Sequence, residues 1–199
     1  MQHNILPRLG AASGALFVVL LFVPSSVGGD SKIILVLELI GFLLFIPFLG
    51  YLWSLLRAGE GPGGWLAATV FGAGLVAIAI KLGSLAPGRA AQDFADATAT
   101  HQALDRMNSV AFMSSMLPLG VMMAAVAVVA LTWGGLPRAL GWLAAVTSPL
   151  LLVNGMFVDA EVGPAFLLFL LWTLLASVVL TIRPVATRAA DAGERARTP

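Results

Sequence analysis

Cysteine is absent from the 199-residue chain, which excludes disulfides, thiol catalysis, iron–sulfur clusters and thiolate metal sites. Charge is scarce as well, because only 11% of the residues are charged whereas 59% are hydrophobic. A water-soluble domain carries about 25% charged residues, so this composition predicts an outer surface solvated by membrane lipid. The formal net charge of +1 gives little long-range attraction for nucleic acid, and we expect no nucleic-acid partner.

Histidine is nearly absent too, since the chain has only His3 and His101. Neither a His-Glu-x-x-His spacing, a Gly-rich phosphate loop nor a dinucleotide fingerprint occurs. We therefore expect no metal and no cofactor. A membrane-embedded hydrolase that pairs Ser114 or Ser115 with His101 is the remaining enzyme hypothesis, and it lacks a Gly-x-Ser-x-Gly context. The sequence leans away from an enzyme.

Long apolar runs are what the chain has in abundance. Each is close to the roughly 20 residues that cross a ~30 Å hydrocarbon core, and none shows the alternation of barrel strands. The predicted spans are Leu9–Gly29, Ile33–Leu56, Trp65–Ala86, Val110–Thr132, Leu140–Val158 and Val162–Ile182. The sequence predicts an all-α, polytopic transmembrane bundle forming one domain over residues 1–183, followed by a mobile cytoplasmic tail over 184–199.

The basic residues indicate the orientation. If six spans alternate, seven arginines fall on the side of the termini and four basic residues fall on or toward the other, which favours cytoplasmic termini. The seven are Arg8, Arg57, Arg138, Arg183, Arg188, Arg195 and Arg197. Four tryptophans, Trp53, Trp65, Trp133 and Trp142, are predicted on that side as an interfacial belt. We expect a bacterial inner (plasma) membrane location.

The first span admits an alternative. Arg8, the apolar stretch after it and the small residues Ser26-Val27-Gly28 are also typical of a signal peptide with a cleavage site. Cleavage would leave the orientation of the remaining spans unchanged.

One connection, residues 87–108, is long enough to form an outer-face segment. Its Ala-rich part, 89–107, has strong helix formers and no Gly or Pro, which predicts a helix lying on or over the outer surface. His101 and Asp105 stand four residues apart on it, where the carboxylate favours a charged imidazole. They predict a pH-sensitive lid, with a solvated charge pair as the alternative.

Glu38 is the most informative residue, because a carboxylate inside a span costs a few kcal/mol unless it is paired, protonated or in water. Lys81 lies at a similar depth in the next, antiparallel span. The pair is interpreted either as a structural ion pair or as a functional site, and Lys81 alone could instead snorkel to the headgroups. Three further polar residues share this layer. The predicted outward-facing polar cavity is lined by Glu38, Lys81, Asn154, Ser114 and Ser115.

The segments Leu136–Leu143 and Phe166–Trp172 give the second half of the chain a resemblance to a known group. With their Leu-Pro-Arg-Ala-Leu-Gly-Trp-Leu and Phe-Leu-Leu-Phe-Leu-Leu-Trp sequences, they resemble small six-span bacterial membrane proteins classed only as a domain of unknown function. The resemblance implies the six-span count and supplies no catalytic residues.

These observations lead to one functional hypothesis and two alternatives. The first is small-ligand binding or transport with Glu38 as the charged group, Lys81 as its partner and Asn154 as a hydrogen-bonding neighbour. The second is a non-catalytic accessory or interaction subunit, and the third is the hydrolase. Expected partners are membrane lipid and either a second copy or another membrane protein. Small-residue pairs such as Gly10-xxx-Gly14 suit such helix packing.

Overall fold

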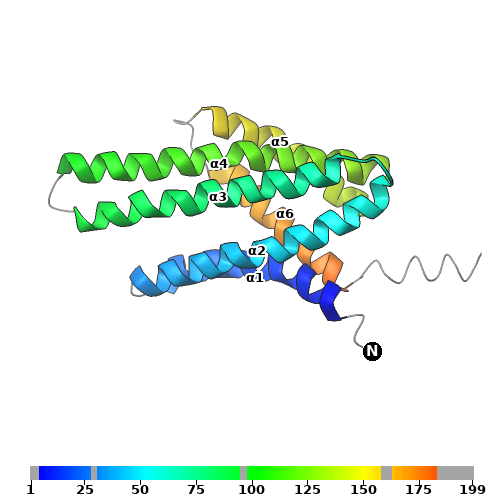
Figure 1. Ribbon diagram of the computed structural model, residues 1–199, viewed down its shortest axis with the longest axis horizontal. Coiled ribbons are helices and arrows are strands. Elements are labelled where there is room, and N and C mark those ends of the chain that lie inside the picture. Colours follow the sequence, from blue (N-terminus) through cyan, green and yellow to red (C-terminus); the bar gives the residue numbers. More distant parts are fainter. Residues whose placement is uncertain (1–4, 28–30, 95–97, 158–162, 183–199) are drawn as a thin grey trace, which may run out of the picture.

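The computed structural model describes residues 5–27, 31–94, 98–157 and 163–182. These residues form six α-helices and no strand, which confirms the predicted all-α fold (Figure 1). All six are long and apolar enough to cross a membrane. The helices are α1 (Ile5–Val27), α2 (Ser31–Glu60), α3 (Leu66–Asp93), α4 (Thr98–Thr132), α5 (Arg138–Met156) and α6 (Gly163–Ile182). The predicted tail over 184–199 lies outside the described residues, as does Gly28 of the possible cleavage site Ser26-Val27-Gly28.

The α3–α4 hairpin is longer than a bilayer requires. With 35 residues, α4 is about 52 Å long at 1.5 Å per residue, compared with a hydrocarbon core of ~30 Å. Figure 1 shows the hairpin reaching beyond α1 and α2 at one end of the bundle. We call this the hairpin end. The opposite end, where α1 begins and α6 ends, is the terminal end.

The predicted surface helix over 89–107 is wrong. Residues 89–93 continue α3 beyond Pro87, and residues 98–107 form the first turns of α4. Both parts of the segment are helical, as predicted, but they belong to two antiparallel helices and not to one. Ala91 is 2% exposed, so pairing the two extensions buries small apolar side chains that a lone surface helix would leave in water.

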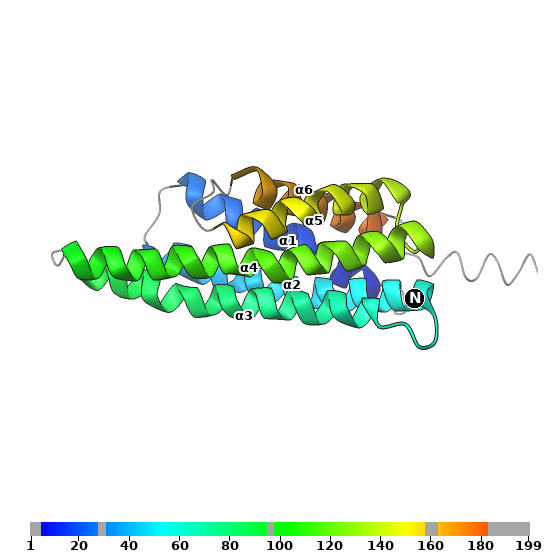
Figure 2. The same ribbon diagram turned by 90° about the horizontal axis from the view of Figure 1, so that it is seen from above.

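The helices pack as two groups of three. In the first, α4 lies between α3 and α5, and in the second α1 contacts both α2 and α6 (Figures 1 and 2). The groups meet mainly where α2 faces α3 and where α5 faces α6. We call them the α3–α4–α5 group and the α1–α2–α6 group.

A polar clasp fixes the connection between the two groups at the terminal end. The Glu60 carboxylate accepts hydrogen bonds from the backbone N–H groups of Leu66 at 2.9 Å and Ala67 at 3.0 Å. It thereby satisfies free donors at the start of α3. Arg57 donates to the carbonyl oxygen of Gly64. A side chain at position 64 would clash with Glu60, because a Cβ there would lie 2.1 Å from Cδ of Glu60. The clasp holds α2 and α3 in a fixed register.

A buried serine joins α1 to α6. The Ser177 hydroxyl donates to the carbonyl oxygen of Ala11 and accepts from the N–H of Ala15 at 2.8 Å. These two backbone groups are four residues apart, so the hydroxyl is inserted beside the hydrogen-bond ladder of α1. An interhelical hydrogen bond of this kind contributes about 0.6 kcal/mol in a membrane. It helps to hold the α1–α2–α6 group together.

Glycines let α4 and α5 approach closely. A Cβ on Gly120 would lie 2.7 Å from Cγ and 3.1 Å from the backbone nitrogen of Leu152. A Cβ on Gly155 would lie 3.0 Å from the backbone nitrogen of Leu117. The hydroxyl of Ser148 donates to the Gly120 carbonyl oxygen at 2.8 Å. In lipid, such close van der Waals packing is a main source of helix association.

Substituting Gly120 by alanine is expected to lower the free energy of unfolding by about 1–3 kcal/mol, because the added methyl group forces α5 away from α4. Unfolding in detergent micelles, followed by loss of helical circular dichroism, measures the change. Gly72→Ala is the matched control, because nothing lies within 4 Å of a Cβ there. Equal stability of the two variants would show that α4 and α5 do not cross closely.

The tryptophans separate into one core residue and a belt. Trp172 is 0% exposed, and its Nε1 donates to the carbonyl oxygen of Leu140 at 2.9 Å. The partner explains how an indole N–H is accommodated in the middle of an apolar helix. The other four are exposed at 41–68% of their surface, and they lie near the ends of α2 and α4 and the starts of α3 and α5: Trp53, Trp65, Trp133 and Trp142.

Candidate functional site

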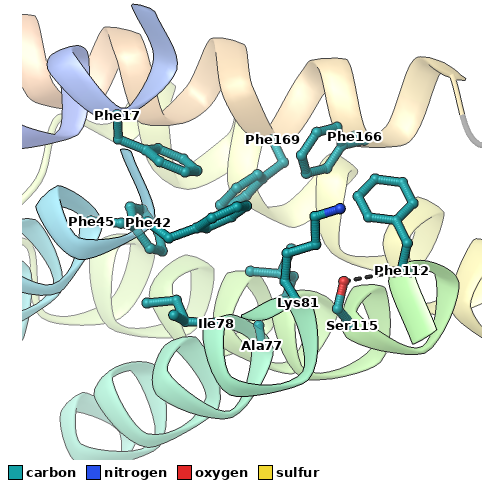
Figure 3. Close-up of a pocket in the computed structure, with 11 residues that line it drawn as sticks. Phe17, Phe42, Phe45, Ala77, Ile78, Lys81, Phe112, Ser115, Phe166 and Phe169 are labelled. Carbon is teal, nitrogen blue, oxygen red and sulfur yellow. Dashed lines mark hydrogen bonds between the residues drawn. The ribbon is translucent and has the colours of Figure 1, made fainter. Parts of the chain in front are cut away.

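Six phenylalanines from both helix groups form one aromatic cluster inside the bundle (Figure 3). The ring centroids are 4.6 Å apart for Phe17 and Phe45, 5.9 Å for Phe45 and Phe169, and 5.2 Å for Phe112 and Phe166. These separations are those of favourable aromatic pairs. We call this set the phenylalanine cluster: Phe17, Phe42, Phe45, Phe112, Phe166 and Phe169.

Lys81 of α3 reaches into this cluster. Its Nζ lies 4.7 Å from the ring centroid of Phe112, and Figure 3 shows the amine between the rings of Phe112 and Phe166. A cavity of about 30 Å³ lies among the cluster, Lys81 and Ser115. An ammonium over an aromatic face is attracted by the ring quadrupole, by ~2 kcal/mol when the contact is desolvated. The side chain is therefore held inside the bundle by Phe112.

Glu38 of α2 and Lys81 line two adjoining pockets. The first, of about 300 Å³, we call the polar pocket, because Arg89, Gln92 and Asn108 also line it. The second, of about 270 Å³, is the apolar pocket. Besides the charged pair, its lining residues are Leu21, Phe22, Phe42, Phe112, Phe166, Leu167 and Leu170. The two charged side chains thus stand at the boundary between polar and apolar surroundings.

The two charges attract one another across this boundary without touching. The Glu38 carboxylate acts electrostatically on the Lys81 ammonium. Among the residues that the structure describes, however, the two do not form a direct ion pair. The polar pocket beside them is roomy enough for water or a small solute. The two interpretations from the sequence, a structural ion pair and a functional site, both stay predictions.

The pair bridges the two helix groups. Glu38 belongs to the α1–α2–α6 group and Lys81 to the α3–α4–α5 group, as do Gln92 and Asn108. A solute bound between the charges would therefore contact both groups at once. Relative motion of the groups would change its surroundings, which is the physical requirement for coupling binding to a conformational change.

Of the five predicted cavity residues, Lys81 shares the polar and apolar pockets with Glu38 and the cavity of about 30 Å³ with Ser115, whereas Glu38 and Ser115 line no pocket together. The Ser114 hydroxyl instead donates to the carbonyl oxygen of Val110 at 2.8 Å, one turn back on its own helix. Asn154 on α5 lines none of the cavity, the polar pocket or the apolar pocket. Its predicted depth did not give its lateral position, because α5 packs on α4 and α6.

Most of the polar pocket and the whole phenylalanine cluster were not predicted from the sequence. Arg89, Gln92 and Asn108 fell in the segment expected to lie over the membrane, so their helices were not extended along the bundle. The three-residue spacing of Phe42 with Phe45, and of Phe166 with Phe169, was a usable signal, since it places two rings on one helix face.

The hydrolase hypothesis finds no support in the geometry. His101 and Ser114 lie on the same helix, about 20 Å apart along its axis. The Ser115 hydroxyl donates to the carbonyl oxygen of Phe112 at 2.6 Å. Within the described residues, no group of three or more His, Asp or Glu side chains is placed to hold a metal ion.

His101 joins the two extensions of the hairpin. Its Nδ1 lies 2.8 Å from the carbonyl oxygen of Ala91, so Nδ1 carries the proton that this hydrogen bond needs. Asp105 is exposed. The lid proposed from these two residues stays a prediction, and the contact that the structure gives His101 is with α3.

His101→Ala is expected to speed amide exchange about fivefold at the end of α3 and the start of α4, since one interhelical hydrogen bond contributes ~1 kcal/mol. Hydrogen–deuterium exchange with mass spectrometry measures this. The control is Gln102→Ala, an exposed neighbour. Unchanged exchange in the His101 variant would mean that the hairpin does not depend on this bond.

Comparisons with known proteins yield no match, whether the chain is compared with protein-family models, curated proteins or solved structures. The resemblance of the second half to six-span bacterial proteins thus stays a prediction.

Proposed function

We propose that this multi-pass membrane protein binds a small polar ligand between Glu38 and Lys81 and carries it across the membrane. The observation that supports this most is that opposite charges from the two helix groups are shared by two adjoining pockets. Charged residues within membrane spans are costly and commonly mark ligand or ion pathways. In this protein the two charged side chains lie beside open pockets and are not fully enclosed by packed side chains.

The position of the site favours transport over simple binding. In many secondary transporters the substrate site lies between two structural units that rock against each other. Glu38 lies five residues beyond Ile33, where the apolar part of α2 begins, or roughly 8 Å along the helix. The phenylalanine cluster continues deeper from there, so a ligand could pass from polar to apolar surroundings between the groups.

The proposed orientation places the terminal end in the cytoplasm of a bacterial inner membrane. Arg8, Arg57 and Arg138 lie in helix segments at that end, which agrees with the positive-inside rule. The polar pocket then opens away from the cytoplasm, because Arg89, Gln92 and Asn108 lie on the hairpin extension.

A non-catalytic accessory subunit is the alternative. The contact of Lys81 with Phe112 favours it, because that contact fixes helix packing without a ligand. This alternative predicts that the protein co-purifies with another membrane protein after mild extraction. It also predicts that Glu38 and Lys81 can be neutralised together without loss of function.

The proposed function is tested by comparing small-solute profiles of cells that overproduce the protein or its variants. We expect the wild type to change the cellular level of at least one small polar solute. Glu38→Gln and Lys81→Met should abolish that change. Leu43→Ala, at a 57% exposed position on the same helix, should preserve it. A profile that depends on neither charged residue would refute the transport role.

A further inference from the structure

We infer that the site is built for a zwitterion with an apolar group, of which an α-amino acid with an aromatic or branched side chain is the simplest example. This inference rests on the proposed function and names its ligand class. It is carried by the placement of one negative and one positive side chain at the junction of a polar and an apolar pocket.

The charges exclude simpler ligands. A ligand with only a positive charge would gain from Glu38 but be repelled by Lys81 and by Arg89, which also lines the polar pocket. One with only a negative charge would gain from Lys81 and Arg89 but be repelled by Glu38. Each repulsion offsets part of the attraction that the opposite charge supplies. A zwitterion meets neither problem, since its ammonium can face Glu38 while its carboxylate faces Lys81. Charge-assisted hydrogen bonds of this type are the strong ones.

The neighbouring groups suit the polar part of such a ligand. The side-chain amides of Gln92 and Asn108 line the same pocket. The Gln92 oxygen already accepts a hydrogen bond from Arg89 at 2.8 Å, which leaves its NH₂ group to donate to a carboxylate. Because Glu38 and Lys81 do not touch each other directly, insertion of the ligand breaks no direct ion pair. The ligand would complete the interaction that the two side chains leave open.

The apolar part has a place immediately beside the charges. Glu38 and Lys81 also line the apolar pocket, together with Phe42, Phe112 and Phe166. In an α-amino acid, the side chain is attached to the same carbon as the ammonium and the carboxylate. An apolar side chain of the ligand would therefore enter this pocket and contact aromatic rings. The volumes of about 300 and 270 Å³ are at the small end of ligand sites. They fit a single amino acid better than a peptide of several residues.

A zwitterionic phospholipid offers the same chemistry from another source. Phe22 and Leu167 line the apolar pocket and are 47% and 51% exposed, so acyl chains could lie against this side of it.

The test therefore begins with the full chain reconstituted in phosphatidylglycerol, which has no zwitterionic headgroup. If phosphatidylethanolamine added afterwards displaces a bound amino acid, the physiological source is the lipid. If it does not, the source is a free solute. Both outcomes support the zwitterion.

Three probes with one aromatic ring and different charges test the inference: L-phenylalanine, 3-phenylpropionate and 2-phenylethylamine. At pH 7 the wild type is expected to bind phenylalanine at least tenfold more tightly than either singly charged probe. Glu38→Gln should bring phenylalanine and phenylpropionate to within about twofold, and Lys81→Met should do the same for phenylalanine and phenylethylamine. Leu43→Ala should keep the wild-type order.

The possible failures are distinguishable. Tighter binding of a singly charged probe, still dependent on Glu38 or Lys81, would overturn the zwitterion and leave the ligand-binding role intact. Absence of binding by all three probes in a folded wild type would overturn the zwitterion as well, and the solute profiles would then decide the proposed function alone. Binding that survives both substitutions would refute the site and the proposed function together.

Discussion

Substituting Phe45 by alanine is expected to remove on the order of 3 kcal/mol from the free energy of unfolding, the largest loss predicted for any single change described here. Phe45 is 2% exposed and contacts the rings of Phe17, Phe48 and Phe169. Its removal leaves a cavity at the centre of the phenylalanine cluster, because helices tied at both ends cannot close around it.

Equilibrium unfolding in detergent micelles measures this loss, with Leu43→Ala as the control. Leu43 lies two residues away on α2 and is 57% exposed, so its truncation exchanges contacts with lipid and not with the core. We expect a change below about 0.5 kcal/mol there. If both variants lost the same stability, the aromatic cluster would not be the packing centre of the bundle.

Neutralising Glu38 and Lys81 singly and together is expected to separate their structural role from their functional one. Lys81→Met leaves a carboxylate in the membrane without its facing cation, and Glu38→Gln leaves the ammonium with only the Phe112 ring. Each single change should destabilise the protein, and the double variant should recover much of the loss. We expect a coupling energy of about 1–3 kcal/mol.

Function should not recover with stability. A double variant that is folded and stable yet inactive in the solute profiles is the result expected if the charges contact a ligand. A double variant as active as the wild type would instead favour the accessory subunit, whose charges only fix packing. Thermal unfolding and the solute profile, measured on the same four proteins, provide both readouts.

The charged pair was predictable from the sequence because of one geometric constraint. Spans joined by a short connection lie antiparallel and adjacent, so similar depth is enough to bring Glu38 and Lys81 to one region. Asn154 was predicted at the same depth as this pair, but α5 joins the bundle through α4 and α6. Depth follows from the count of residues, whereas lateral position depends on which helix faces pack together.

The hairpin and the aromatic cluster show two further limits. Helix propensity identified the helical character of residues 89–93 and 98–107 but could not indicate that they belong to two antiparallel helices, α3 and α4. Similarly, the sequence shows three-residue spacings of Phe42 with Phe45 and of Phe166 with Phe169. Whether such rings face lipid or one another depends on helix rotation, which long, uniformly apolar spans do not specify.

The most direct test of a ligand site open to water is thiol accessibility, which the absence of cysteine in the chain makes clean. Single cysteines would replace Glu38, Gln92 and Leu43, and a membrane-impermeant maleimide would be added to intact cells. Labelling at 92 shows that the reagent reaches the hairpin end from the outside of the cell. Position 43 shows how a lipid-facing cysteine reacts. We predict labelling at 38 and 92 and none at 43. Labelling at 92 with full protection at 38 would contradict a water-filled pocket between Glu38 and Lys81.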